Sequence, residues 1–138
     1  MREKFDLQER FIDFAVCVLK LCEALPKTFA GQHIASQLIR SATSTASNYG
    51  ESQGAESRAD FVHKLGVALK EMRESHVWLR IIAKAGMLEK PEKLQPILQE
   101  ANELASILFA GVSTAKRNIA SKRNPPSPEN PAQNPEEL

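Results

Sequence analysis

The stretch SRADFVHKLGVALKEMRESHVWLRIIAKAG, residues 57–86, decides the fold class. It opens with Ser57 and Asp60, an S-x-x-D pattern that is typical of a helix N-terminus. Gly86 follows at the other end, as a C-terminal glycine does in many helices. Between them, apolar residues recur every three or four positions, which is one face of a helix: Phe61, Leu65, Ala68, Met72, Leu79 and Ile82. The stretch therefore predicts one long amphipathic helix.

The same periodicity predicts two helices before this stretch. The first runs from about Lys4 to Leu25, where Pro26 stops it. The second runs from about Gly31 to Tyr49, where Gly50 is its natural stop. Residues 50–56 are small and polar, so we expect them to form a loop.

A fourth helix opens around Pro91 and continues to about Ser121, and Pro96 either kinks it or marks its true start. Residues 124–138 contain five prolines and one large apolar residue, so we predict a disordered tail after a bundle domain of residues 1–123. Four long helices joined by short loops predict an all-α fold, an antiparallel up-down-up-down four-helix bundle.

The composition fits a single globular domain, with 138 residues of which 42% are hydrophobic and 25% charged. The net charge of +1 gives no global sign of a nucleic-acid partner. Cys17 and Cys22 point roughly 140° apart on one helix and cannot bridge each other, so we expect free thiols that act as small core residues in a cytoplasmic setting. No apolar run predicts a signal peptide or a membrane span.

The third and fourth predicted helices are apolar over a wider arc than one core requires. At about 100° per residue, the cluster from Val77 to Ile82 covers roughly 200°, whereas a core stripe needs only somewhat over 100°. The surplus predicts a subunit interface, with these members: Val77, Trp78, Ile81 and Phe109. The alternative is that Trp78 and Phe109 only close the ends of the bundle.

No active site can be assembled from the sequence. His33, His63 and His76 are not spaced as metal ligands, and no Glu-x-x-His motif occurs, so we predict neither a metal nor another cofactor. No Ser-His-Asp set is evident either. We therefore predict that the protein is not an enzyme, and the competing enzymatic hypothesis is built around Arg40, Glu51 and His63.

The second predicted helix carries six hydroxyl residues between Ser36 and Ser47, with Arg40 as its formal charge. One interpretation is close packing of small side chains, and the other is a hydroxyl-lined polar surface. An Arg40 that points inward requires a carboxylate partner. We therefore predict a structural polar network of five residues: Arg40, Asn48, Glu51, Glu71 and Glu74.

Positive charge gathers at the end of the fourth predicted helix, where no acid follows Glu103. Cations are favoured there by the helix dipole, so a solvated surface is the default interpretation. The alternative is a surface for RNA or DNA, which grows if several copies present the same end together. The candidate residues are Lys116, Arg117, Lys122 and Arg123, with Lys64, Lys70 and Arg73 from the third helix.

Several motifs in the second and third helices resemble one bacterial family. They are the run Ser36-Gln37-Leu38-Ile39-Arg40-Ser41-Ala42-Thr43-Ser44, then Asn48 and Gly50-Glu51, and later Ala68-Leu69-Lys70-Glu71, Trp78-Leu79 and Ala85-Gly86. Over roughly residues 5 to 120 the chain resembles the four-helix-bundle family named after proteins encoded in intervening sequences of 23S ribosomal RNA genes. The accessory protein of diversity-generating retroelements is similar to that family.

The resemblance implies an antiparallel four-helix bundle and a ring-shaped homopentamer. For the retroelement branch it also implies binding of nucleic acid and of a reverse transcriptase through basic surfaces. It carries Arg40, Asn48 and Glu51 over as family positions with a structural role. The expected function is therefore that of a non-enzymatic homo-oligomer that binds RNA or DNA, and the alternative is a protein-interaction scaffold with no nucleic-acid role.

Overall fold

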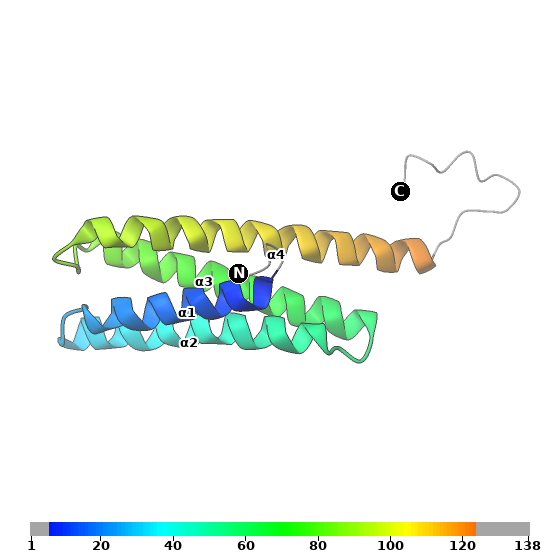
Figure 1. Ribbon diagram of the computed structural model, residues 1–138, viewed down its shortest axis with the longest axis horizontal. Coiled ribbons are helices and arrows are strands. Elements are labelled where there is room, and N and C mark those ends of the chain that lie inside the picture. Colours follow the sequence, from blue (N-terminus) through cyan, green and yellow to red (C-terminus); the bar gives the residue numbers. More distant parts are fainter. Residues whose placement is uncertain (1–5, 124–138) are drawn as a thin grey trace, which may run out of the picture.

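The structure is a computed structural model that describes residues 6–123, and these residues form four α-helices and a short 3-10 turn. Figure 1 shows successive helices joined by turns at alternating ends, so that each runs back beside the one before it. The all-α, four-helix class is thereby confirmed, and the predicted tail at residues 124–138 lies outside the described residues. The elements are α1 (Leu7–Glu23), α2 (Phe29–Gln53), α3 (Arg58–Lys84), η1 (Pro91–Lys93) and α4 (Leu94–Arg123).

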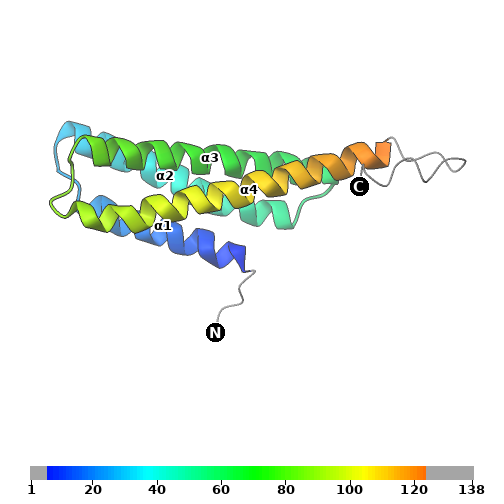
Figure 2. The same ribbon diagram turned by 90° about the horizontal axis from the view of Figure 1, so that it is seen from above.

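The helices form two layers, α1 with α2 and α3 with α4 (Figures 1 and 2). α1 is the shortest helix with 17 residues, whereas α4 has 30. At about 1.5 Å per residue, α1 is some 20 Å shorter than α4. The turn between α2 and α3 and the C-terminal part of α4 therefore extend beyond the start of α1 (Figure 1). None of the described helices is long and apolar enough to cross a membrane.

The core lies between the two layers and is apolar. Its fully buried side chains include Phe11, Leu38, Met72 and Leu104, one from each helix. Burying a side chain of this size stabilises the fold by about 1.5 to 3 kcal/mol each. Of the two cysteines, Cys22 belongs to this core as predicted. The prediction was wrong for Cys17, which is exposed, because it lies on the outer side of the turn that buries Val18.

The hydroxyl residues of α2 divide between the core and the surface. Ser41 of α2 and Ser75 of α3 are both fully buried, and their Oγ atoms lie 2.7 Å apart. Thr45 is also fully buried and donates its hydroxyl to the Ser41 carbonyl oxygen at 2.9 Å. Thr43 and Ser47 are exposed. Close packing therefore explains the inner hydroxyls, and the outer ones face solvent.

The ends of α3 lie where their local signals predict. The Ser57 side chain accepts a hydrogen bond from the Asp60 backbone N–H at 3.0 Å, which satisfies one of the first-turn donors. Gly86 has φ of +62°, and the Met87 N–H donates to the Ile82 carbonyl oxygen at 3.2 Å. This is a Schellman ending, in which the left-handed position favours glycine.

Two helix ends differ from the prediction. α2 continues through Gly50 and ends at Gln53, with Gly54 as its C-cap. A Cβ at Gly50 would lie 3.2 Å from Oε1 of Gln8, so its absence lets α1 approach α2. Pro96 does not kink α4, since the α-helix begins at Leu94 and Pro96 lies in its first turn. A first-turn N–H has no partner within the helix, so proline is tolerated there.

Candidate functional site

One exposed face of α3 and α4 combines apolar and cationic side chains. Val77, Ile81 and Phe109 are 49%, 38% and 54% exposed. The Arg73 guanidinium lies over the Phe109 ring, 5.6 Å from its centroid, and both line a shallow groove of about 390 Å³. We call this surface the basic face, which comprises Lys70, Arg73, Val77, Arg80, Ile81 and Lys84 of α3 with Phe109 of α4.

The basic face carries an excess of positive charge, although Lys70 lies close enough to Glu74 to help lower the pKa of that carboxyl. Its α3 cations are spaced by three, seven and four residues, so they share one side of the helix. None of them forms an ion pair with a residue in the described range 6–123. His76 lies in the same groove, where burial and the charge of Arg80 lower its pKa. The imidazole therefore resists protonation, and the charge comes from the Lys and Arg side chains.

A second exposed apolar stripe lies on α1, and we did not predict it from the sequence. Ile12, Val16 and Leu19 are 37%, 40% and 43% exposed. Glu9 and Glu23 are exposed at its two ends, and the spacing of three and four residues puts all five on one side of α1. We call this surface the acidic stripe. The repeated spacing was the signal in the sequence that would have revealed it.

The acidic stripe points away from the core on the side of α1 next to α2. Its apolar residues lie about 100° to 160° around the helix from the buried Val18. Gln8 lies on that side and donates its side-chain N–H to the Ala46 carbonyl oxygen of α2 at 3.5 Å. Arg10 lies on the other side, where it pairs with Glu100 of α4 at 2.7 Å.

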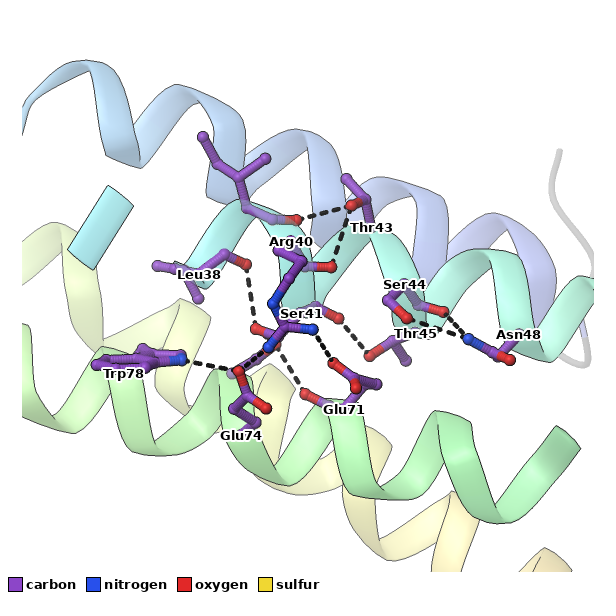
Figure 3. Close-up of polar contacts among 12 residues, drawn as sticks. Leu38, Arg40, Ser41, Thr43, Ser44, Thr45, Asn48, Glu71, Glu74 and Trp78 are labelled. Carbon is purple, nitrogen blue, oxygen red and sulfur yellow. Dashed lines mark hydrogen bonds and ion pairs between the residues drawn. The ribbon is translucent and has the colours of Figure 1, made fainter. Parts of the chain in front are cut away.

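Three residues of the predicted polar network come together between α2 and α3 (Figure 3). The Arg40 guanidinium pairs with Glu71 at 2.9 Å and also with Glu74, which accepts a further hydrogen bond from Trp78 Nε1 at 3.1 Å. The Arg40 side chain is 48% exposed, so it does not point inward, and its carboxylate partners lie at the surface. Its aliphatic stem lies along the helices while its charge stays in water.

Hydrogen bonding fixes the charge of this cluster. Burial alone would raise the pKa of Glu74, but the hydrogen bonds from Trp78 and Arg40 outweigh it and leave that pKa lowered. The same hydrogen bonds, to Glu74 and then to Glu71, raise the pKa of Arg40. Both pKa shifts favour the ionised forms of Glu74 and Arg40.

The other two predicted members lie elsewhere. Asn48 donates to the Ser44 carbonyl oxygen within α2 at 2.9 Å (Figure 3), and Glu51 pairs with Lys64 at 2.6 Å. Lys64, proposed as a nucleic-acid contact, thus has its charge matched within the chain. The sequence did not reveal the Glu51–Lys64 pairing because it depends on how α2 and α3 lie against each other, whereas Asn48 and Ser44 are four residues apart on one helix.

Trp78 differs from its apolar neighbours on α3. It is half-buried, packs against the core and contacts the His33 ring edge-on at 6.1 Å between centroids. These contacts and the hydrogen bond to Glu74 hold Trp78 against α2 and the core, away from the basic face. The alternative hypothesis was that Trp78 and Phe109 close the ends of the bundle. Phe109 does not fit it, because this residue lies in the middle of α4 and is 54% exposed.

The cations at the end of α4 surround the helix. Lys116, Arg117 and Lys122 are exposed, and at about 100° per residue they point in three directions. Arg117 donates to the Thr114 hydroxyl at 3.3 Å. Arg123 is the last residue of α4, and the structure describes only its place in the helix. These residues therefore present a charged tip with no single flat patch.

A hollow of about 730 Å³ lies near this tip, where α1 does not reach. Its wall includes Phe61 and Val62 of α3 and Gly111 and Asn118 of α4, and no His, Cys, Asp or Glu side chain lines it. Within residues 6–123, no group of three or more such side chains is placed to hold a metal ion. The residues of the enzymatic hypothesis are not brought together, since Arg40 and Glu51 have different partners.

The fold and its surfaces thus define a small all-α bundle protein that carries an acidic stripe, a basic face and a charged tip. The chain belongs to the 23S rRNA-intervening sequence protein family, whose model matches residues 3–110. The predicted family is thereby confirmed.

A solved structure supports the same fold. The chain is 30% identical, with a TM-score of 0.69, to a protein with unknown function from the S23 ribosomal protein family of Bacteroides thetaiotaomicron VPI-5482. The alignment covers 76% of this chain and 96% of that one. A comparison with curated proteins finds no match.

Proposed function

We propose that this protein is a non-enzymatic, cytoplasmic homo-oligomer whose assembled copies bind RNA or DNA. The observation that supports assembly is the joint exposure of Val77, Ile81 and Phe109 on one face. Contiguous apolar side chains in water are unfavourable, and association removes them from it. The family resemblance implies five copies, and we propose a pentamer.

Two observations support nucleic acid as the ligand. The charged tip of α4 has three exposed cations, and no acid occurs between Glu103 and Arg123. One tip carries too little charge for firm binding, but assembly multiplies it, and the summed field attracts phosphates. The family to which the chain belongs is also named after 23S ribosomal RNA.

Light scattering coupled to size exclusion tests the assembly. The proposal requires a mass of five times the 15.3 kDa chain at micromolar concentration. A different multiple would contradict only the number of copies. A mass of 15.3 kDa at every concentration would contradict self-association itself.

Gel-shift titration at low salt tests nucleic-acid binding, with structured RNA, single-stranded RNA and duplex DNA as probes. We expect the triple variant Lys116→Gln, Arg117→Gln and Lys122→Gln to bind more weakly. The slope of the logarithm of the binding constant against the logarithm of the salt concentration should become shallower by about 0.7 to 0.9 for each lost phosphate contact. The matched control is a triple variant at the opposite end of the bundle (Figure 1), in which Lys27, Lys90 and Lys93 are changed to Gln. No shift with any probe, or equal loss in the control, would contradict the proposal.

The alternative function is a protein-interaction scaffold, favoured by the net charge of +1 and by the internal pairing of Lys64 with Glu51. A reverse transcriptase is the partner that the family resemblance implies. A stoichiometric protein partner that survives nuclease treatment, together with negative gel shifts, would establish the scaffold in place of nucleic-acid binding.

A further inference from the structure

We infer that copies of this chain join head to tail, with the acidic stripe of one copy packed against the basic face of the next. This inference rests on the proposed self-association and adds which surfaces meet. Each copy offers both surfaces, and the partner is therefore a second copy of the same chain.

The two surfaces match in length and in apolar content. The acidic stripe runs from Glu9 to Glu23 and the basic face from Lys70 to Lys84, fourteen positions in each case and about 21 Å of helix. Each has three exposed apolar side chains in its middle. Pairing the two surfaces covers the exposed large apolar residues of both.

The two surfaces also match in charge. Glu9 and Glu23 flank the apolar residues of α1, with Lys20 exposed at the edge of the stripe, whereas Lys70 and Lys84 flank those of α3, with Arg73 and Arg80 between. The acidic stripe therefore keeps a net negative charge and the basic face a net positive one. Opposite charges across an interface speed encounter and set the register. Pairing two basic faces, or two acidic stripes, would bring like charges together and is disfavoured. The charges therefore select unlike pairing over like pairing.

The surfaces lie on opposite layers of the bundle. The acidic stripe belongs to the layer of α1 and α2, and the basic face belongs to the layer of α3 and α4 (Figures 1 and 2). A copy that uses one surface keeps the other free, so further copies can add. Such a contact builds a ring where the rotation between copies closes and an open filament where it does not, whereas a two-fold contact would stop at a dimer.

This pairing also divides the predicted cations between two roles. Lys70 and Arg73 were candidates for nucleic-acid contact, and the interface instead places them against the acidic stripe. The charged tip of α4 lies at one end of the bundle and stays outside the contact (Figure 1). Assembly and nucleic-acid binding are therefore separable by mutation.

Complementary interface variants test the inference. Val16→Asp blocks the acidic stripe and Val77→Asp blocks the basic face, and both residues are exposed, so the bundle should still fold, as circular dichroism would verify. We expect each variant alone to be monomeric. Mixed in equal amounts, they should form a heterodimer of twice the chain mass, because each supplies the intact surface that the other needs. Ser47→Asp, on an exposed position of α2, is the matched control and should assemble as the wild type does.

Each outcome has one meaning. A monomeric wild type contradicts the proposed self-association and this inference with it. A wild type that assembles, with Val16→Asp assembling equally well, contradicts head-to-tail pairing alone. Two monomeric variants that stay monomeric when mixed also contradict it, because unlike surfaces would then not bind each other.

Charge exchange gives a second readout. Glu9→Lys with Glu23→Lys should weaken assembly, and Lys70→Glu with Lys84→Glu should weaken it equally. A chain with all four changes should recover assembly, since the opposite charges face each other again. Failure to recover would show that these charges do not meet.

Discussion

Glu74 accepts hydrogen bonds from Trp78 and from Arg40, and these bonds keep a charged carboxylate beside a half-buried ring. Because the pKa of Glu74 is lowered, its ionised form stabilises the fold above the unfolded-state pKa of 4.5. That contribution is lost as the pH falls through the lower pKa of the folded state. The arrangement is thus an acid-sensitive contact.

We predict that Glu74→Gln reduces the loss of stability on acidification. At pH 7 the variant should lose about 1 kcal/mol or less, because Arg40 is largely in water and such pairs are weak. Urea unfolding at pH 7 and pH 3 measures the difference between the two conditions. Glu92→Gln removes an exposed carboxylate outside the cluster and serves as control. An unchanged pH dependence in Glu74→Gln would contradict the prediction.

The two cysteines should differ in reactivity. Burial raises the pKa of the Cys22 thiol to about 11, although Lys27 acts in the opposite direction, whereas Cys17 is exposed. The thiolate is the reactive form, so a disulfide reagent should modify one thiol per native chain and two per unfolded chain. Cys17→Ser should abolish the native reaction. Fast modification of both thiols in the native protein would show that the α1 packing opens readily.

Glycine should have opposite effects on stability inside α3 and just after its C-terminal end. Gly66 is inside the helix and Gly86 has φ of +62°, and a Cβ at either would meet no atom within 4 Å. We predict that Gly66→Ala stabilises the protein by about 0.5 to 1 kcal/mol, since glycine costs helix entropy. Gly86→Ala should destabilise it by about 1 to 2 kcal/mol, since the left-handed position penalises a side chain.

Chemical denaturation of both variants measures the two effects. Each is the control for the other, because the substitution is the same and no side-chain contact changes. Destabilisation by both changes would mean that space, and not backbone conformation, decides the result.

The helix ends show which parts of the fold a sequence can reveal. Ser57 and Gly86 act on the backbone within their own helix, so the bounds of α3 follow from local patterns. The same rules predict a stop at Gly50, yet α2 passes through it, and Gln8 of α1 packs against it. That contact joins residues far apart in sequence, and local patterns do not contain it.

For the same reason, the sequence predicted the candidate surfaces only in part. Of the residues in the excess apolar arc on α3, Val77 and Ile81 are exposed, whereas Trp78 is held by α2 and by Glu74. The apolar side of α1 was read only as a core stripe, so its outward residues, such as Val16, were missed. Periodicity counts the apolar residues of a helix, and only the tertiary arrangement determines which neighbour covers them.

At the scale of the whole molecule, assembly and folding should be linked. Because the copies bind one another only when they are folded, association stabilises the folded state by mass action. A tenfold rise in concentration adds about 1.4 kcal/mol per binding event, which for a domain of this size raises the Tm by roughly 4 to 6 °C.

We therefore predict that the Tm of the wild type rises across two orders of magnitude in concentration. Val16→Asp should have a constant Tm equal to that of the dilute wild type, because it removes association and leaves the core intact. Differential scanning calorimetry measures both series, with Ser47→Asp as the control that keeps the wild-type slope. A constant Tm in the wild type would mean that the bundle is stable alone and that its exposed apolar surfaces serve another partner.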